Sequence, residues 1–159
     1  MRIIIALLIS FPLLAQVSAY VTGGQSFRQR FDGSNPTVGV EVRYAQASAF
    51  WEYTPERGDA GSRERSQAFG GRVYAPLGSV EVFASGGRSF GESGYYYRGR
   101  SEHWVDYPFH AWFAGAGAKV PIAKRLFLLG EYRRIVDQQT LNRLTLKPNV
   151  WQVGLSFQF

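Results

Sequence analysis

The fold is decided by Val150-Trp151-Gln152-Val153-Gly154-Leu155-Ser156-Phe157-Gln158-Phe159. Every odd-numbered residue from Trp151 to Phe159 is large and apolar, whereas the even-numbered residues between them are glutamine, glycine or serine. A β-strand points alternate side chains to opposite faces, so this segment has one apolar face and one polar face. About ten residues tilted at roughly 45° cross a bilayer. The segment is therefore predicted to be a membrane-crossing strand with an aromatic terminus.

The other end of the chain, Met1 to Ala19, has the features of a cleaved secretory signal. Arg2 supplies a positive charge, an apolar run extends from Ile3 to Leu14, and Val17-Ser18-Ala19 is a small-residue cleavage site. The apolar run is too short to span a membrane, and no other stretch approaches the length of about 18 apolar residues that a helix needs. We therefore expect a signal peptide over residues 1–19 and one exported domain over residues 20–159.

Composition and charge narrow the class of protein. The chain contains no cysteine, 18 glycines and 16% aromatic residues, and its formal net charge is +6. An exported domain without disulfides needs another source of stability, and a closed ladder of hydrogen bonds in lipid is one. Export argues against nucleic acid as a partner, and so does the absence of basic runs, because the arginines are spread singly along the sequence. The basic charge instead suits anionic lipid or lipopolysaccharide phosphates.

The mature sequence divides into eight segments of about ten residues with alternating character. The predicted strands are residues 20–28, 37–44, 47–53, 66–75, 79–88, 109–120, 124–134 and 150–159. Three connections are tight turns, at Ala45-Gln46, Pro76-Leu77-Gly78 and Pro121-Ile122-Ala123, and four are long, at residues 29–36, 54–65, 89–108 and 135–149. Short turns at one end and long loops at the other predict an all-β, eight-stranded antiparallel up-and-down transmembrane β-barrel in the outer membrane.

Aromatic residues gather near the ends of these predicted strands. Trp51, Tyr53, Trp112, Tyr132 and Trp151 are expected at the outer interface, and Tyr44, Phe157 and Phe159 at the periplasmic interface. Rings at both levels are typical of the girdles that meet the lipid headgroups.

The opposite parity of the strands carries charged residues in equal numbers of each sign. They are Glu41, Arg43, Glu52, Arg72, Glu81, Lys119, Glu131 and Arg133. A charge in a dry interior needs a partner, and the lumen of an eight-stranded barrel is just wide enough for side chains to fill. We expect an interior ionic core, with Gln152, Ser156 and Gln158 satisfying spare donors and acceptors. A narrow solute pore remains the alternative for this polar face.

The whole mature chain resembles the small eight-stranded OmpA-like and OmpX-like outer-membrane barrels. The residues that carry the resemblance are the closing residues 154–159, the stretch Gly115-Ala116-Gly117-Ala118-Lys119-Val120, and Leu126 to Arg134. The resemblance implies that Phe157 and Phe159 form an assembly signal for the barrel-assembly machinery. It also implies structural, adhesive or other surface roles, because one barrel architecture serves many functions.

A lipid A-modifying hydrolase is the enzymatic alternative. Such an enzyme needs a nucleophile beside a base, and Ser101 with His103 in the third outer loop is the nearest approach to that arrangement. The His-x-Ser motif of lipid A deacylases is absent at His103 and at His110. Two histidines without cysteine do not make a closed zinc site, and no cofactor or metal is expected.

The third outer loop has the composition of a contact surface. Arg98, Arg100 and Trp104 lie among several tyrosines there, and arginine and aromatic residues are enriched in interfaces. Arginine also matches phosphate in a bidentate fashion. The sequence therefore favours a non-enzymatic barrel that contacts lipopolysaccharide or another surface partner through its outer loops.

Overall fold

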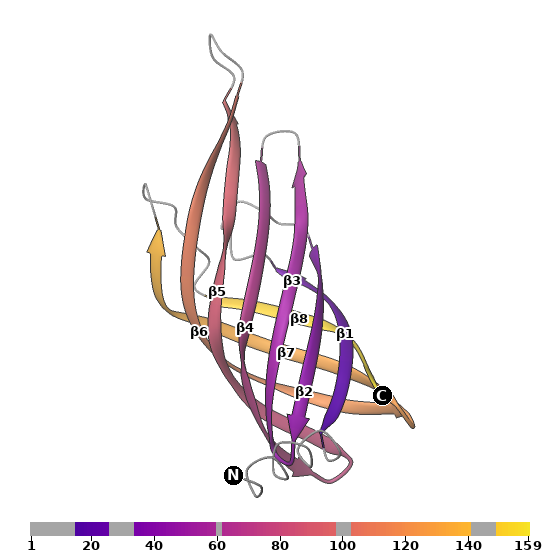
Figure 1. Cartoon of the computed structure of the whole chain (residues 1–159). Coiled ribbons are helices and arrows are strands. Elements are labelled where there is room, and N and C mark those ends of the chain that lie inside the picture. Colours follow the sequence, from indigo (N-terminus) through magenta and orange to yellow (C-terminus); the bar gives the residue numbers. More distant parts are fainter. Residues whose placement is uncertain (1–14, 26–33, 60–61, 98–102, 141–148) are drawn as a thin grey trace, which may run out of the picture.

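The computed structural model describes residues 15–25, 34–59, 62–97, 103–140 and 149–159; within these ranges the side chains of residues 25, 34–35, 57–59, 62–64, 93–97, 103–107 and 138–140 are not described. The described residues form eight strands: β1 (Gln16–Gln25), β2 (Ser34–Tyr44), β3 (Ala47–Asp59), β4 (Ser62–Leu77), β5 (Val80–Tyr97), β6 (His103–Ala123), β7 (Leu126–Thr140) and β8 (Asn149–Gln158). Each strand pairs antiparallel with the next, and β8 pairs with β1, so the sheet closes into a barrel (Figure 1). The predicted eight-stranded antiparallel barrel is confirmed. Among the described residues, no helix has the length and apolar character needed to cross a membrane.

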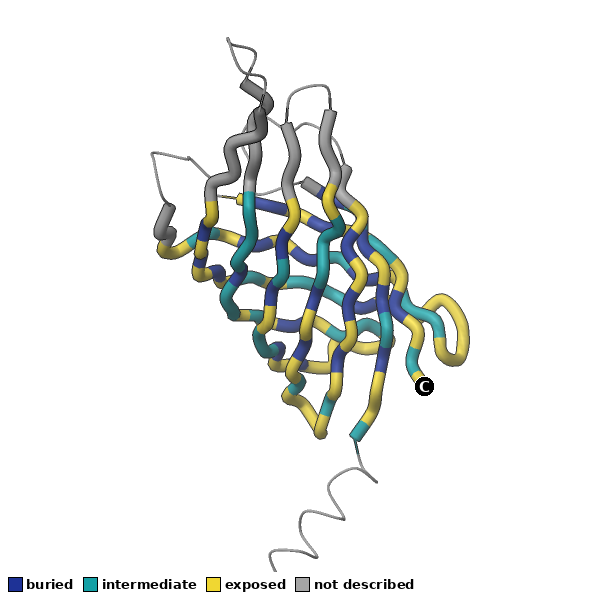
Figure 2. The backbone as a smooth tube through the Cα atoms, turned by 45° about the horizontal axis from the view of Figure 1, so that its top comes forward, coloured by how far each residue is buried: buried dark blue, intermediate teal, exposed yellow. Residues whose placement is uncertain are grey.

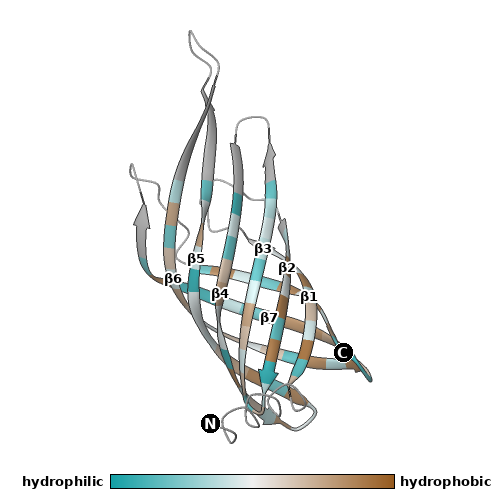
Figure 3. Cartoon of the chain, in the orientation of Figure 1, coloured by the Kyte–Doolittle hydropathy of each residue, from teal (hydrophilic) through white to brown (hydrophobic). Residues whose placement is uncertain are grey.

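The apolar side chains lie on the outer wall of this barrel. In β8, Trp151, Val153, Leu155 and Phe157 are 43–50% exposed, whereas the side chains between them are buried or half-buried. Figure 2 shows this alternation of buried and exposed residues along the strands, and Figure 3 shows the hydrophobic stretches of the wall. An exposed apolar wall over a polar interior is the arrangement expected in hydrocarbon.

The aromatic residues of the two predicted girdles point outward. Trp51, Trp112, Tyr132 and Trp151 are each more than 40% exposed, and the rings of Trp51 and Tyr53 stack with centroids 6.4 Å apart. At the opposite end, Tyr44, Phe157 and Phe159 are exposed, and the rings of Phe157 and Phe159 meet edge to face at 5.3 Å.

Three tight turns join strands at the end of the barrel where β1 begins and β8 ends. They lie at Ala45-Gln46, Gly78-Ser79 and Lys124-Arg125. Ala45 and Gly78 adopt positive φ angles of 52° and 64°, which let such short connections follow the twist of the strands.

The predicted position of two of these turns is wrong. Pro76 and Pro121 lie inside β4 and β6 and pair with Glu81 and Phe127. Both prolines are exposed near a strand end, and Pro121 adjoins an irregularity of the β6–β7 register. A proline is tolerated at such positions because a missing N–H there disturbs the ladder little.

Several strands are longer than predicted, because residues assigned to loops continue the ladders. β5 has 18 residues and β6 has 21, and their pairing continues to Tyr97 and His103, deep into the segment predicted to be the third outer loop. The tyrosines and the tryptophan of that segment favour strands, which outweighs the glycine and serine between them. The ladder therefore forms a hairpin that projects beyond the barrel wall (Figure 1).

Small residues in β6 make room for large side chains in the lumen. A Cβ atom at Gly117 would overlap the ring of Phe83 and the carbonyl oxygen of Gly130. A Cβ atom at Gly115 would lie 2.6 Å from the Ser85 hydroxyl and 3.2 Å from Cγ of Arg133. Glycine at these two positions lets the Phe83 ring and the Arg133 side chain reach the barrel axis.

Candidate functional site

The interior of the barrel holds a buried cluster of three carboxylates and three cations. Its members are Glu41 on β2, Glu52 on β3, Arg72 on β4, Lys119 on β6, and Glu131 and Arg133 on β7. None of the six is more than 6% exposed. These six residues are called the ionic core below, and their formal charges cancel.

Glu41 accepts hydrogen bonds at both of its carboxylate oxygens. Its Oε2 accepts from Nζ of Lys119 at 2.8 Å and from Nη1 of Arg72 at 3.3 Å. Its Oε1 accepts from the hydroxyls of Ser48 and Tyr74, each at 2.5 Å. A carboxylate with four such donors keeps its charge in an interior that excludes water.

Arg133 forms two forked ion pairs. Its Nη1 and Nη2 donate to the two oxygens of Glu52 at 2.6 and 2.7 Å. Its Nε and Nη2 donate to the two oxygens of Glu131 at 2.8 and 2.9 Å. This double bidentate geometry uses the planar guanidinium fully, and lysine has no equivalent of it.

Arg72 connects the three carboxylates. Its Nη2 donates to Glu131 at 2.6 Å and to Glu52 at 3.3 Å, and its Nη1 donates to Glu41 at 3.3 Å. The guanidinium carbon lies 4.3 Å from the ring centroid of Phe50, so an aromatic face covers the cation as well. Bonds between β2, β3, β4, β6 and β7 thus tie opposite walls of the barrel together.

Four hydroxyl-bearing residues support the ionic core and were not predicted from the sequence. Tyr20 donates to Glu52 at 2.8 Å and Ser85 donates to Glu131 at 2.7 Å, while Ser48 and Tyr74 serve Glu41. All four share the inward parity of their strands, which is the signal that identifies them. Of the residues expected to fill this role, Gln152 bonds Thr22 at 3.4 Å and the buried hydroxyl of Ser156 has no partner in the described part of the chain.

The remaining two charged residues of the interior form a separate pair at the periplasmic mouth. Nη1 of Arg43 lies 2.8 Å from Glu81, and the two side chains are 18% and 31% exposed. Beside them is a hollow of about 10 Å³, lined in part by Lys119, Ser156 and Gln158. This volume is about the room of one water molecule. The structure therefore places all eight charged residues inside the barrel, six as one cluster and two as a pair at its mouth.

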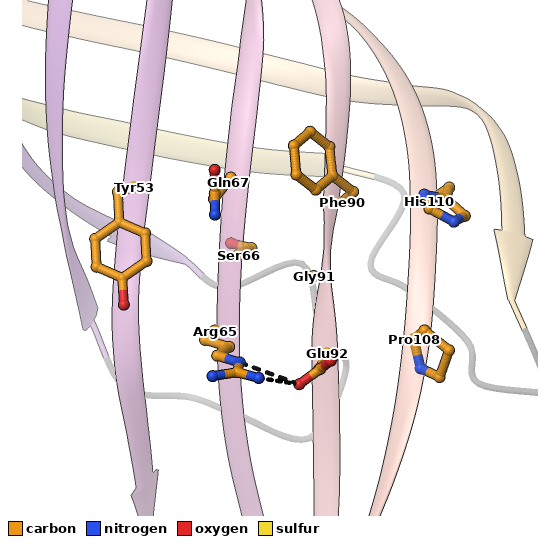
Figure 4. A pocket seen from close by; sticks show the side chains of 9 residues that line it. All are labelled: Tyr53, Arg65, Ser66, Gln67, Phe90, Gly91, Glu92, Pro108 and His110. Atoms are coloured by element: carbon orange, nitrogen blue, oxygen red, sulfur yellow. Dashed lines mark hydrogen bonds and ion pairs between the residues drawn. The ribbon is translucent and has the colours of Figure 1, made fainter.

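A second polar feature lies on the outer wall, across β3, β4, β5 and β6. Tyr53, Gln67, Phe90 and His110 are consecutive partners in the ladders and form one row. Arg65, Glu92 and Pro108 form the next row, toward the outer hairpins, with Nη2 of Arg65 2.6 Å from Glu92 (Figure 4). These residues, with Ser66 and Gly91, line a hollow of about 500 Å³. It is called the outer trough below.

The outer trough adjoins Arg88, an arginine for which the described residues provide no ion pair. Arg88 lies between Phe69 and Trp112 in the ladders, one row from Phe90, and its guanidinium carbon is 5.5 Å from the Trp112 ring centroid. Its Nε is buried without a hydrogen-bond partner, and the described part of the chain offers it no carboxylate at ion-pair distance. The row of Arg88 is that of the girdle residues Trp51 and Trp112, so the trough begins where hydrocarbon gives way to headgroups.

Most of the predicted loop contacts lie outside the residues whose side chains the structure describes. Arg98, Arg100 and Ser101 fall outside the described residues, and Trp104 and His103 lie on β6 with side chains that are not described. His110 is exposed on the outer wall, in the trough. Among the described residues, no group of three or more His, Asp or Glu is arranged to hold a metal ion.

A closed eight-stranded barrel with an apolar wall, aromatic girdles and a charge-neutral interior defines the class of small transmembrane β-barrels. A sequence model described as the outer membrane protein beta-barrel domain matches residues 21–159, so the chain belongs to that family. The predicted outer-membrane location and the predicted resemblance to small eight-stranded barrels are thereby confirmed. No curated protein matches the sequence.

Solved structures show the same fold at low sequence identity. The N-terminal β-barrel domain of Pseudomonas aeruginosa OprF is 14% identical with a TM-score of 0.61, over 91% of this chain and 97% of that one. Ail, the attachment invasion locus protein of Yersinia pestis, is 11% identical with a TM-score of 0.59, over 91% and 97%. Neisserial surface protein A is 14% identical with a TM-score of 0.54, over 91% and 96%.

Proposed function

We propose that this protein is a non-conducting, non-enzymatic outer-membrane barrel that binds lipopolysaccharide on its outer wall and presents its outer hairpins to a surface partner. The observation that carries the proposal is the contrast between two sets of charges. Every carboxylate of the ionic core is paired, whereas Arg88 at the lipid interface forms no ion pair with any residue that the structure describes. An arginine in contact with lipid headgroups is stabilised when it meets an anion there.

The chemistry of the outer trough suits the phosphorylated sugars of lipid A. Arg88 supplies a cation held against Trp112, while Tyr53, Gln67 and His110 supply hydrogen-bonding groups beside it. The volume of about 500 Å³ lies within the range of clefts that bind small molecules. The trough also lies at the outer girdle, which is the level of the outer-leaflet headgroups.

The outer hairpins support the second half of the proposal. β5 and β6 remain paired for nine residues beyond Arg88, which corresponds to a projection of roughly 30 Å along the strand. Trp104 pairs with Tyr96 near the end of that ladder, and Arg98 and Arg100 follow Tyr97 in the sequence. Arginine with aromatic residues suits an anionic partner. Ail, which has the same fold, has been crystallised with the heparin analogue sucrose octasulfate.

Phosphorylated lipid A is the probe that tests the outer trough. The wild type and an Arg88→Gln variant are placed in phosphatidylcholine nanodiscs and titrated with lipid A carrying both phosphates. Loss of one charge-assisted contact predicts roughly tenfold weaker binding by the variant. Arg125→Gln, which removes the same charge at a periplasmic turn, is the matched control and should bind like the wild type. Equal affinities for wild type and Arg88→Gln, or equal losses in both variants, would overturn the trough as the binding site.

Comparison of lipid A from cells with and without the protein tests the absence of enzymatic activity. We expect identical acyl-chain patterns by mass spectrometry. Loss of an acyl chain that depends on Ser101 or His103 would establish the hydrolase instead.

The terminal aromatic residues are proposed to be read by the barrel-assembly machinery. Phe159 is 69% exposed and its ring contacts only the outward Phe157 among the described aromatic pairs, so Phe159→Ser removes no lumen contact. We expect a reduced level of the variant in the outer membrane with unchanged unfolding of the fraction that assembles. Wild-type membrane levels would contradict this role.

A further inference from the structure

The four residues Gln16 to Ala19, predicted to end the signal peptide, form the first part of β1. They pair one by one with β2, from Gln16 opposite Arg43 to Ala19 opposite Val40. On the other side, Ser18 and Ala19 pair with Gln158 and Phe157 of β8. The backbone N–H of Phe159 donates to the carbonyl oxygen of Val17 at 2.9 Å. These residues therefore close the seam of the barrel against the last residues of the chain.

The side chains of this segment follow the pattern of the barrel. Ser18 is 7% exposed and, with Gln16, lines the small hollow beside Arg43 and Glu81. Val17 is 43% exposed on the outer wall, like the other outward valines. The alternation that begins here continues without interruption to the buried Tyr20 and Thr22. This alternation and the position at the mouth of the lumen are expected of residues that remain in the mature barrel, and they are not expected of a segment that is cleaved off.

Strand length gives an independent argument. β1 has ten residues from Gln16 to Gln25, which matches the roughly 9–11 residues that a tilted strand needs to cross a bilayer. A strand that began at Tyr20 would leave Val40 to Arg43 of β2, and Phe157 and Gln158 of β8, without their β1 neighbours. Backbone groups at an open sheet edge in lipid are costly, so a barrel avoids such a gap.

We propose that the signal peptidase cleaves after Ala15, so that the mature chain begins at Gln16 and Val17-Ser18-Ala19 is strand. Ala15 is the only alanine between Ala6 and Ala19, and cleavage after it keeps the apolar run from Ile3 to Leu14 intact. Ala15 fits the small residue required next to the cut, although Leu13 at the third position before it is larger than the usual choice. The strand pairing therefore selects the site that the small-residue pattern alone ranks lower.

Peptide mapping by mass spectrometry of the protein from outer membranes decides the site. We expect a mature N-terminal peptide that starts at Gln16, in its free or cyclised pyroglutamate form. A peptide that starts at Tyr20 would overturn the proposal.

Two variants sharpen the test. Ala15→Leu places a bulky residue next to the proposed cut and should cause the precursor to accumulate. Ala19→Leu makes the same change at the rejected site, where the residue pairs with Phe157 and points outward, and should be processed like the wild type. Blocked processing of Ala19→Leu with normal processing of Ala15→Leu would also overturn the proposal.

Discussion

The arginines inside the barrel and those on its outer wall have opposite surroundings. The side chain of Arg133 is 1% exposed and is paired with two carboxylates in forked geometry. On the outer wall, the side chain of Arg65 is 54% exposed and pairs with Glu92, and Arg88 has no ion pair among the described side chains. Arginine is thus enclosed by carboxylates inside the barrel, whereas on the outer wall it is either exposed in a single pair or, at Arg88, without a carboxylate among the described residues.

This difference indicates that the interior and the outer wall of the barrel have different roles. Inside, water is excluded, so each charge needs partners from the chain, and loss of one partner leaves another charge buried alone. Outside, water and lipid headgroups screen the charges, so a single pair contributes little to folding. We therefore expect the interior to control stability and the outer wall to control binding.

Removal of one interior cation should have the largest effect. Arg133→Met leaves Glu52 and Glu131 without their forked partner, which predicts a loss of about 3–5 kcal/mol in the free energy of unfolding. Urea unfolding of the protein in phospholipid vesicles measures this change.

The matched control is Arg134→Met, because Arg134 is the neighbouring residue on the exposed parity of β7. We expect that variant to unfold within about 1 kcal/mol of the wild type. Similar losses of unfolding free energy in the two variants would show that the ionic core contributes no more to stability than an arginine on the outer wall.

Substitutions at two adjacent residues of β6 compare the packing of the inner and outer faces without changing any charge. Gly117→Val inserts a side chain into the ring of Phe83, whereas Ala116→Val adds methyl groups toward lipid. Overpacking of a filled interior predicts a loss of about 1–3 kcal/mol for the first variant and almost none for the second. The same unfolding titration separates them, and equal stability of the two variants would contradict a filled lumen.

The exposed pair of the outer trough should show the smallest effect. Glu92→Gln removes the partner of Arg65, and both side chains are more than 40% exposed. We expect a change below about 1 kcal/mol in the free energy of unfolding, and less at high salt. A loss as large as that of Arg133→Met would contradict the difference in stability between charges on the outer wall and charges in the interior.

The alternation of polar and apolar residues was sufficient to predict the barrel, its strand number and its inward-facing charges. The alternation of polar and apolar residues is visible within a single strand. It therefore assigns Glu131 and Arg133 to the lumen even when the strands beside them are not known. Strand ends were predicted less well, because a strand continues as long as the strand beside it offers backbone hydrogen bonds. Tyr97 and His103 belong to strands for this reason, although glycine and serine in between suggested a loop.

The partners of the interior charges could not be predicted from the sequence. Arg72 on β4 meets Glu131 on β7 only because the barrel closes and directs both side chains to its axis. The outer trough depends on register as well, since Tyr53, Gln67, Phe90 and His110 form a row only in the observed pairing. Long-range register is set by the whole sheet, which no short pattern records.

Conductance in planar bilayers tests the sealed interior most directly. The purified wild type, with its insertion verified, is recorded beside a reconstituted porin that shows how an open channel behaves in the same bilayer. Because the ionic core and its aromatic neighbours fill the lumen, we predict no steady single-channel current from the wild type. Steady, ion-selective channels from the wild type would contradict the account.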